Sequence, residues 1–320
     1  MNIGIIGAGR IAEKLAIAIN NVDGAVLYSV SSRSFDRSRA FAEKFNAKVW
    51  YEGTDDFYKD EKLDLVYIAT PNSLHKKYTI DAIKNKKAVL CEKPFALNYK
   101  ESMDMFNIAE ENDVLLLEAM WTKYFPAVKR VKELLDSGVL GEIQTIQGDL
   151  SYPIDEDKDR MFKKSLGGGA LLDLGIYPIT MAHYFLGNPD RIVADAHFTP
   201  GGVDESTSVI FSYNSGAKAL LTCSMKTIST NEFVISCTNG WIRLNGSFHY
   251  PKSISLHING VGEQHQEFPW ETEGYEYQIK GLLEDYNSGL KDGSIVRKSD
   301  TLEIMKILDE VRKQIGYEFE

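Results

Sequence analysis

"GIIGAGRIA", residues 4–12, joins a short apolar run to a segment with helical spacing. Gly7, Gly9 and Ala12 in this stretch form the pattern G-x-G-x-x-A. Gly7 suits a tight turn, Gly9 lets a pyrophosphate approach the backbone, and Ala12 lets the helix pack closely on the strand. The amino terminus of the helix favours negative charge at the same place. The stretch therefore predicts a strand, a phosphate-binding turn and a helix, provided that an alternating α/β pattern follows it.

Such a pattern follows over the first 121 residues. Apolar runs predict strands at residues 2–7, 25–30, 48–51, 63–70, 87–92 and 114–120. Helical spacing between these runs predicts helices at residues 10–19, 35–45, 75–86 and 99–112. Because strands and helices alternate, we expect a parallel sheet wound with helices on both faces.

The pattern changes after Trp121. A helix closed by glycine is predicted at residues 125–141, and a glycine-entered helix at 167–187. Strands without helical crossovers are predicted at residues 142–152, 191–198, 206–213, 218–225, 233–245 and 253–258, followed by helices at 277–289 and 301–316. The expected α/β architecture is thus a doubly wound domain, residues 1–121, and an α+β domain with a large, mostly antiparallel open sheet, residues 122–320.

The composition narrows the class of partner. The chain has 320 residues, 43% of them hydrophobic, and a net charge of −10. An acidic balance argues against nucleic acid and anionic membranes as partners. The beginning of the sequence does not resemble a signal peptide, no apolar run approaches the ~20 residues of a membrane helix, and three dispersed cysteines indicate neither disulfides nor a metal site. We therefore expect a cytoplasmic protein without a metal.

The second predicted strand bears on the choice of dinucleotide. NAD enzymes usually carry an acidic residue at its end, which binds the ribose hydroxyls. Ser32 stands there instead, followed by Arg33, with Arg37 further along. A hydroxyl and a guanidinium suit a 2′-phosphate, which a carboxylate would repel. The sequence favours NADP over NAD; the alternative is that Arg33 is only a solvated surface residue.

The stretch "YIATPNSLHKKYTIDAIKNKKAVLCEKP", residues 67–94, makes a family comparison specific. Its Thr-Pro-Asn, histidine and Glu-Lys-Pro elements, with "GGGALLDLGIYPI" further along, resemble the Gfo/Idh/MocA (glucose–fructose oxidoreductase and inositol dehydrogenase) family. "EAMWTKYFPA" and Tyr177 are most similar to the dimeric dihydrodiol dehydrogenase and NADP-linked xylose dehydrogenase branch. The resemblance implies a Rossmann domain, a nicotinamide cofactor, and a cis bond between Lys93 and Pro94.

The resemblance also implies the catalytic residues Lys93, Tyr177 and Asp173. Lys93 ends a parallel strand, where open α/β sheets bind ligands, and a dehydrogenase must move the hydroxyl proton. Most of the family has histidine in place of Tyr177. A phenol is protonated at neutral pH, and a nearby ammonium stabilises its phenolate. We expect Tyr177 to exchange the proton, Lys93 to assist it, and Asp173 to orient Lys93 or a substrate hydroxyl. Lys93 as the acid/base, with Tyr177 as hydrogen-bond donor, is the open alternative.

The predicted cofactor-binding residues lie in the glycine-rich turn, after the second, fourth and fifth strands, and after the sixth. They are Gly7, Ala8, Gly9, Arg10, Ile11, Ser32, Arg33, Thr70, Pro71, Asn72, His75, Glu92, Lys93 and Trp121. For His75, helix capping or a surface position is an equal alternative to seating the cofactor.

The expected function is NADP-preferring oxidation or reduction at a secondary alcohol or carbonyl of a sugar, cyclic polyol or dihydrodiol. The alternatives are another carbonyl or imine substrate, a nicotinamide-dependent glycosidase, and a redox-silent NADP sensor. The second-domain strands carry apolar residues on both faces, so one face needs a cover. A second copy of the chain is the expected cover, in a homodimer or homotetramer.

Overall fold

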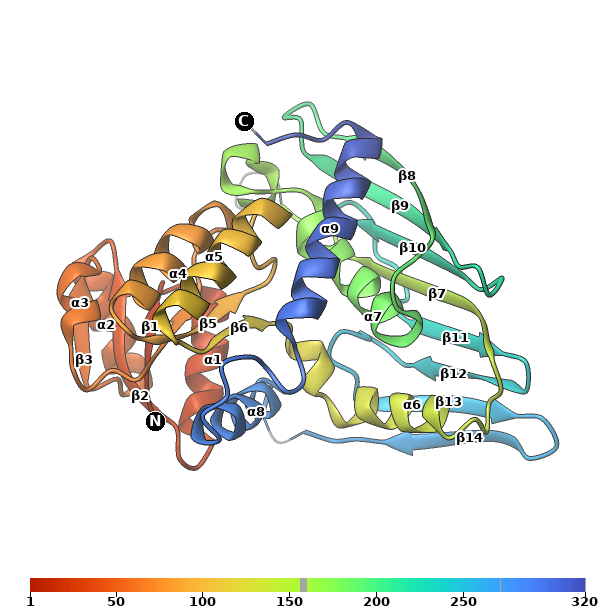
Figure 1. Cartoon of the computed structure of the whole chain (residues 1–320), viewed down its shortest axis with the longest axis horizontal. Coiled ribbons are helices and arrows are strands. Elements are labelled where there is room, and N and C mark those ends of the chain that lie inside the picture. Colours follow the sequence, from red (N-terminus) through yellow and green to blue (C-terminus); the bar gives the residue numbers. More distant parts are fainter. Residues whose placement is uncertain (156–159, 271, 320) are drawn as a thin grey trace. The chain divides into compact units, whose positions relative to one another are not determined.

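The computed structural model describes residues 1–155, 160–270 and 272–319 (Figure 1). The chain forms two compact units, and each contains two segments of sequence. The first unit contains Met1–Trp121 and Glu271–Leu302, and the second contains Thr122–Trp270 and Glu303–Glu320.

The first unit is built on a six-stranded parallel sheet in the order β3-β2-β1-β4-β5-β6. The predicted doubly wound sheet is confirmed. Its strands are β1 (Asn2–Ile6), β2 (Val26–Ser32), β3 (Val49–Glu52), β4 (Leu65–Ile68), β5 (Ala88–Glu92) and β6 (Leu116–Ala119). The strands β4 and β5 and the edge strand β6 are buried along their whole length, which explains their mostly apolar sequences.

Helices flank this sheet in two groups. They are α1 (Arg10–Asn20), α2 (Phe35–Phe45), α3 (Asp55–Lys59), α4 (His75–Lys84) and α5 (Tyr99–Asn112), with a short 3-10 helix, η1 (Asn72–Leu74). Helix α1 packs against α2. The helices α4 and α5 pack against each other and lie side by side in Figure 1. The helix α3 was not predicted, because five residues are too few to show helical spacing.

The first unit differs from the predicted domain division in one respect. Its first segment ends at Trp121, but the unit also includes Glu271–Leu302, a segment predicted to belong to the second domain. The helix α8 (Glu276–Asn287) of this segment buries Ile279 and Leu282 and packs against α1. Its helical spacing predicts a buried face, but such spacing does not say which domain supplies the other side of the contact.

The second unit is built on an eight-stranded sheet in the order β14-β13-β12-β11-β7-β10-β9-β8. The strands are β7 (Ile143–Ser151), β8 (Arg191–Phe198), β9 (Asp204–Ser212), β10 (Lys218–Ser224), β11 (Phe233–Cys237), β12 (Gly240–Leu244), β13 (Ser253–Ile258) and β14 (Gly262–Glu267). Within this sheet, β7 and β10 pair in parallel and the other described neighbours pair antiparallel, so the predicted mostly antiparallel sheet is confirmed.

Two details of this sheet differ from the prediction. The stretch predicted as one strand at residues 233–245 forms two, β11 and β12, because Gly240 at φ +152° follows a tight turn. The strand β14 was not predicted. Its sequence, "GEQHQE", has no apolar alternation, and it lies at the edge of the sheet, where it pairs with β13.

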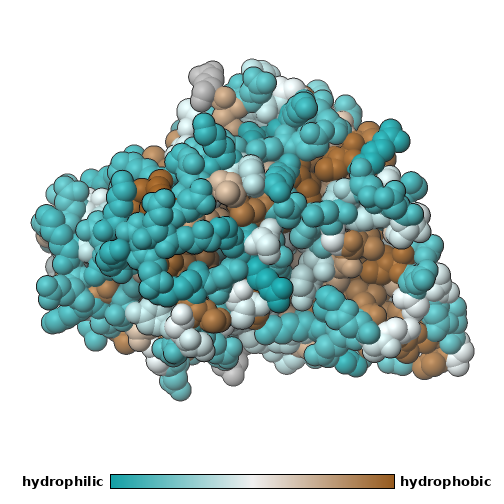
Figure 2. All heavy atoms as spheres, viewed as in Figure 1, coloured by the Kyte–Doolittle hydropathy of each residue, from teal (hydrophilic) through white to brown (hydrophobic). Residues whose placement is uncertain are grey.

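Helices cover one face of the second sheet (Figure 1). They are α6 (Pro126–Asp136), the π-helix η5 (Leu171–Gly175) and α7 (Ile176–Leu186). The helix α6 packs on β12 and β13, and α7 packs on β7 and β10. The last helix, α9 (Lys298–Ile315), begins in the first unit and continues in the second. Figure 2 shows hydrophilic side chains over the helices of the first unit, and hydrophobic ones gathered over the region of α7 and the eight-stranded sheet.

The predicted helix at residues 167–187 is in fact two consecutive helices. Leu171–Gly175 is π-helical and Ile176–Leu186 is α-helical. Pro178 lies in the first turn of α7, where its missing N–H removes the bond that Leu174 O would accept in a continuous α-helix. The wider turn before Pro178 accommodates that loss.

Candidate functional site

The glycine-rich turn between β1 and α1 has the conformation that the sequence predicts. Gly7 has a φ of +111°, and a Cβ placed on it would lie 2.4 Å from Ala69 O. Both the backbone and the available space therefore require glycine. Gly9 is the N-cap of α1, makes no side-chain cap, and would carry a Cβ without meeting any atom within 4 Å. The helix amino terminus is thus accessible to an anion. The other residues of the turn, Ala8, Arg10 and Ile11, are half-buried or exposed, and Ala12 is fully buried.

The end of β2 carries the residues that were predicted to select the cofactor. The hydroxyl of Ser32 donates to Ser34 O (2.9 Å) and lies 2.8 Å from the Ser38 hydroxyl. Arg33 is exposed to solvent. Arg37 Nη2 donates to Ala8 O (3.3 Å), so this residue ties α2 to the glycine-rich turn. The structure brings Arg37 to the turn and leaves Arg33 at the solvent side of the strand end.

His75 connects the loops that follow β4 and β5. It is fully buried; its Nε2 lies 3.0 Å from Thr70 O, and its Nδ1 lies 2.8 Å from Pro94 O. The surface alternative for His75 is therefore wrong. Because these loops contain Thr70-Pro71-Asn72 and Glu92-Lys93-Pro94, the histidine fixes their spacing at the carboxyl ends of two adjacent strands.

Lys93 directly follows β5, and its side chain is half-buried. The Lys93–Pro94 peptide bond is cis, which confirms the prediction. The neighbouring Glu92 is 7% exposed and accepts a hydrogen bond from the Tyr67 hydroxyl. Burial, followed by the charge of Glu92, raises the pKa of Tyr67 well above its usual value. The phenol of Tyr67 thus remains a donor to the Glu92 carboxylate.

Trp121 packs against an aromatic ring from the second segment of the first unit. Its ring stacks on that of Tyr275, with 3.9 Å between centroids and 6° between planes. Trp121 and Tyr275 are each 5% exposed. Lys14 on α1 lies over the ring of Tyr275, with its Nζ 5.9 Å from the ring centroid. The stacking places an apolar wall beside the end of β6.

Tyr177 lies in an aromatic cluster of the second unit. It belongs to the first turn of α7, is 7% exposed, and its ring centroid is 5.0 Å from that of His249. Thr122 Oγ1 donates to His249 O (2.7 Å), which fixes the backbone of the histidine. Tyr152 lies on another side of His249, at 6.1 Å between centroids, with its hydroxyl 2.8 Å from Ser247 Oγ. Burial raises the pKa of Tyr152 to about 12, and nearby phenols including Tyr177 contribute.

Asp173 belongs to the π-helix that precedes Tyr177 and is 4% exposed. Arg160 donates to its Oδ2 from Nη1 (2.9 Å) and to its Oδ1 from Nη2 (2.6 Å). Both oxygens of the carboxylate are thus bound by one guanidinium. Of the predicted catalytic residues, Asp173 and Tyr177 belong to the second unit and Lys93 to the first.

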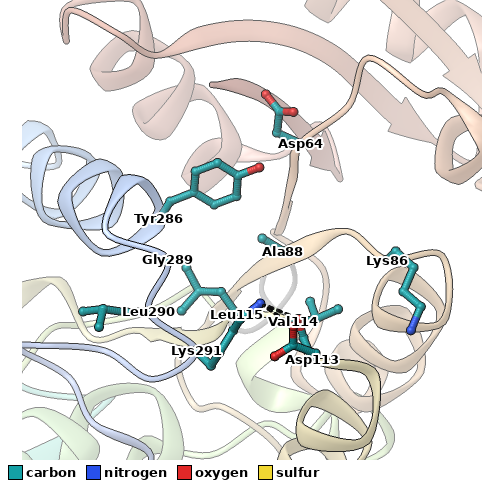
Figure 3. A pocket seen from close by; sticks show the side chains of 10 residues that line it. All are labelled: Asp64, Lys86, Ala88, Asp113, Val114, Leu115, Tyr286, Gly289, Leu290 and Lys291. Carbon is teal, nitrogen blue, oxygen red and sulfur yellow. Dashed lines mark hydrogen bonds and ion pairs between the residues drawn. The ribbon is translucent and has the colours of Figure 1, made fainter.

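A separate pocket lies at the amino ends of strands of the parallel sheet (Figure 3). It has a volume of about 340 Å³, and it is lined by residues before β4, β5 and β6 and by the end of α8: Asp64, Lys86, Ala88, Asp113, Val114, Leu115, Tyr286, Gly289, Leu290 and Lys291. Lys291 forms an ion pair with Asp113 (3.0 Å), and Lys86 donates to Asn112 Oδ1 (3.0 Å). The pocket borders the amino ends of the strands, whereas the predicted site residues of the first unit lie at the carboxyl ends.

Several residues of these clusters were not predicted. Tyr67, Tyr275, Tyr152 and His249 contact predicted site residues or their immediate neighbours. Tyr67 and Tyr152 both lie within predicted strands, which is a weak signal for a position near a site. Tyr275 and His249 lie in loops, and no spacing in the sequence links them to Trp121 or Tyr177.

The first unit fits a dinucleotide on two structural grounds. The space over Gly9 is open at an uncapped helix amino terminus, and the buried hydroxyl of Thr70 makes no hydrogen bond with any described residue. Backbone N–H groups of the turn can bind a pyrophosphate, and the Thr70 hydroxyl remains available to a ligand. Within the described ranges, no cluster of His, Cys, Asp and Glu side chains is arranged to hold a metal ion, and none of the helices is both long and apolar enough to cross a membrane.

A doubly wound sheet with an open phosphate-binding turn, joined to a second unit with a large open sheet, defines a two-domain dinucleotide-binding protein. Residues 1–120 match the family described as "Oxidoreductase family, NAD-binding Rossmann fold", and residues 128–243 match the "GFO/IDH/MocA C-terminal domain". The chain belongs to the GFO/IDH/MocA family of oxidoreductases, as its resemblance implied.

Similar proteins cover nearly the whole chain. The trans-1,2-dihydrobenzene-1,2-diol dehydrogenase of Danio rerio is 31% identical, over 98% of this chain and 96% of that protein. The Mus musculus enzyme of the same name is 29% identical, with 99% and 97% covered. A solved 3-ketoreductase from Actinomadura kijaniata, in complex with NADP and TDP-benzene, has a TM-score of 0.90 and 26% identity, with 98% of each chain covered.

Proposed function

We propose that this protein is an NADP-preferring dehydrogenase that acts on a secondary alcohol, or the corresponding carbonyl, of a sugar, cyclic polyol or dihydrodiol. The observation that carries the proposal is an open phosphate-binding turn in the same unit as Lys93, which follows the buried end of β5. The relatives' names support the reaction class, since they are a dihydrodiol dehydrogenase and a ketoreductase.

The dinucleotide is held by the glycine-rich turn and the loops after β2, β4 and β5. The nicotinamide, when bound, accepts or returns the hydride. Gly7 and Gly9 leave the α1 amino terminus open to the pyrophosphate, and His75 holds the β4 and β5 loops at a fixed spacing. Trp121, stacked on Tyr275, excludes water from the end of β6. These residues bind and orient; they exchange no proton.

Proton transfer is assigned to Tyr177 and Lys93. Tyr177 exchanges the proton with the substrate oxygen, and the ammonium of Lys93 stabilises the phenolate and binds the same oxygen. His249 packs beside the Tyr177 ring and limits its motion. Asp173, held by Arg160, orients Lys93 or a substrate hydroxyl. In support, solved variants of the similar ketoreductase replace a tyrosine by phenylalanine or a lysine by alanine.

The test is an absorbance assay for reduced cofactor with pentoses, hexoses, inositols and dihydrodiols, each with NADP and with NAD. We expect turnover with at least one class and a higher kcat/KM for NADP than for NAD. Tight NADPH binding without turnover of any substrate, in either direction, would refute the proposal and favour a redox-silent sensor.

The proposal includes an assembly through the open face of the second sheet. On that face Val193, Ile210 and Leu220 are 43%, 41% and 39% exposed and lie in one row across β8, β9 and β10. Arg191 and Asp195, both exposed, lie on β8 on either side of Val193. A two-fold axis along the row brings Arg191 of each copy opposite Asp195 of the other, and covers the apolar residues.

We also propose that the protein is cytoplasmic. Cys91, Cys223 and Cys237 are all free thiols, and two of them are buried. Unpaired cysteines are typical of proteins in reducing compartments.

A further inference from the structure

Asp204 is a carboxylate in the core of the second unit that the proposed reaction does not use. It begins β9 and is 0% exposed. Its Oδ2 accepts hydrogen bonds from Leu171 N (2.7 Å) and from Thr207 Oγ1 (2.7 Å), and its Oδ1 bonds to no other described residue. Burial of a carboxylate is costly, so its contacts deserve a functional explanation.

The bond to Leu171 caps the start of the π-helix that contains Asp173. Helices begin with N–H groups that lack partners within the helix, and a carboxylate is a strong acceptor for them. Here the acceptor comes from a strand 33 residues further along the chain, because no side chain at the local N-cap, Ala170, supplies one. The position of the π-helix therefore depends on Asp204.

The glycine loop before the π-helix is shaped around the same carboxylate. Gly169 has a φ of +114°, and a Cβ there would lie 2.1 Å from Asp204 Oδ1 and 3.3 Å from Tyr317 Cε1. Tyr317 also donates from its hydroxyl to Gly168 O (2.9 Å). At the other end of the π-helix, a Cβ on Gly175 would lie 2.9 Å from Cys223 Sγ. The segment is thus held at both ends by groups outside it.

We propose that Asp204 is a positioning residue for the reaction: by capping the π-helix it fixes the segment that carries Asp173 and Tyr177, and it acts on turnover and not on cofactor binding. The inference rests on the proposed function for its effect on turnover. Its structural part, the dependence of the segment on Asp204, stands independently of that function.

The surroundings of Asp204 make this position responsive to pH. Burial, with a contribution from Asp173, raises the pKa of Asp204 to about 7, although its hydrogen bonds oppose the shift. The other titratable groups that face it are the thiol of Cys223 on β10 and the phenol of Tyr317, on which Arg312 of α9 also acts. An ionised Asp204 is a stronger acceptor for Leu171 N–H than a protonated one, so we expect kcat to rise as pH increases through about 7.

The experiment compares Asp204→Ala and Asp204→Asn with the full-length protein and a matched control. Asp285→Asn is the control, because Asp285 is 1% exposed and accepts a backbone bond from Ser294 N (3.2 Å), but lies in the first unit. The readouts are hydrogen exchange of the peptide covering residues 167–177, kcat per cofactor-binding site, and the pH profile of kcat.

For Asp204→Ala we expect exchange of the 167–177 peptide to rise, and kcat to fall, by about tenfold, with cofactor affinity changed by less than about twofold. Asp204→Asn keeps an acceptor for Leu171 N–H, so it restores most of the protection but removes the change in kcat near pH 7. The control variant leaves all three readouts unchanged.

Wild-type exchange in the 167–177 peptide of Asp204→Ala would overturn the inference. So would increased exchange spread evenly over all peptides of the second unit, since that indicates a general loss of stability. If the wild-type protein turns over no substrate, the proposed function fails, and the exchange measurement alone decides the inference.

Discussion

Arg160 binds Asp173 through two hydrogen bonds, one to each carboxylate oxygen, at 2.9 and 2.6 Å. Asp173 is 4% exposed and Arg160 35% exposed, so the guanidinium lies between the carboxylate and solvent. A planar two-bond pair fixes the orientation of a carboxylate more strictly than a lysine would. From the sequence, Asp173 is expected to orient Lys93 or a substrate hydroxyl. The structure adds a partner for its carboxylate, Arg160, from a 3-10 helix that precedes Gly167–Gly169.

Replacing Arg160 tests whether this pair orients the site. We expect Arg160→Ala to lower the free energy of unfolding by about 1–3 kcal/mol, because a buried carboxylate loses two bonds. We also expect kcat to fall more than cofactor affinity, and Arg160→Lys to recover only part of it. The measurements are denaturant unfolding and steady-state kinetics. Arg243→Ala, which removes a partly exposed pair with Glu232 in the same unit, is the control; equal effects of both variants would contradict an orienting role.

A variant of Arg33 tests the proposed preference for NADP over NAD. Loss of a charge-assisted hydrogen bond costs about 1.5–3 kcal/mol, so Arg33→Ala should raise the Kd for NADP by about 10- to 100-fold and leave the Kd for NAD nearly unchanged. Fluorescence titration with both dinucleotides measures this. Arg39→Ala is the control, since Arg39 pairs with Asp36 and Glu43 on the exposed face of α2. An equal loss for NAD and NADP would remove the 2′-phosphate argument.

The raised pKa of Asp204 predicts how the stability of the protein depends on pH. Its folded pKa, about 7, lies above the ordinary value of 3.8, so folding favours its protonated form. The cost of ionising it in the core is absent below about pH 4 and grows as pH rises to about 7, to an upper limit on the order of 4 kcal/mol. The free energy of unfolding of Asp204→Asn, relative to that of the wild type, should therefore increase as pH rises from 4 to 7. Above pH 7 the difference should stay constant. Thermal unfolding of both proteins across this range measures it, and a pH-independent difference is the contrary result.

If two copies of the chain associate through the exposed face of the second sheet, their association should depend on the charges beside that face. With the two-fold axis along the Val193–Ile210–Leu220 row, Asp195→Arg places like charges opposite each other and should weaken self-association, by about tenfold or more in Kd. The exchanged variant, Arg191→Asp with Asp195→Arg, should restore it. Sedimentation measures the Kd. If the single and exchanged variants associate equally well, this axis is wrong.

Much of the fold follows from local patterns in the sequence. The alternating runs of the first 121 residues predict all six parallel strands, because these strands are mostly apolar and the longer helices between them show helical spacing. The edge strand β14 and the helix α3 escape prediction, since one is polar throughout and the other too short. The assignment of α8 to the first unit also escapes it, because packing partners are a tertiary property.

The candidate site likewise contains features that the sequence predicts and features that it does not. Gly7 and the cis Lys93–Pro94 bond follow from motifs whose chemistry is local or from the family resemblance. The partners of the site residues do not. Arg160, His249 and Tyr275 reach Asp173, Tyr177 and Trp121 across 13, 72 and 154 positions of sequence, and no periodicity connects positions so far apart.

The most direct test of the proposed chemistry is a double-mutant cycle of Lys93→Ala and Tyr177→Phe, with single-turnover formation of NADPH as the readout. Tyr213→Phe is the control, because it removes a hydroxyl bonded to Gly187 O at the far end of α7. Each single variant should slow the reaction by about 10²- to 10⁴-fold, and Tyr177→Phe should leave NADP affinity little changed. The double variant should be hardly slower than the slower of the two single variants. Near-normal turnover by Tyr177→Phe, or single effects that multiply in the double variant, would contradict joint proton transfer by the ammonium and the phenol.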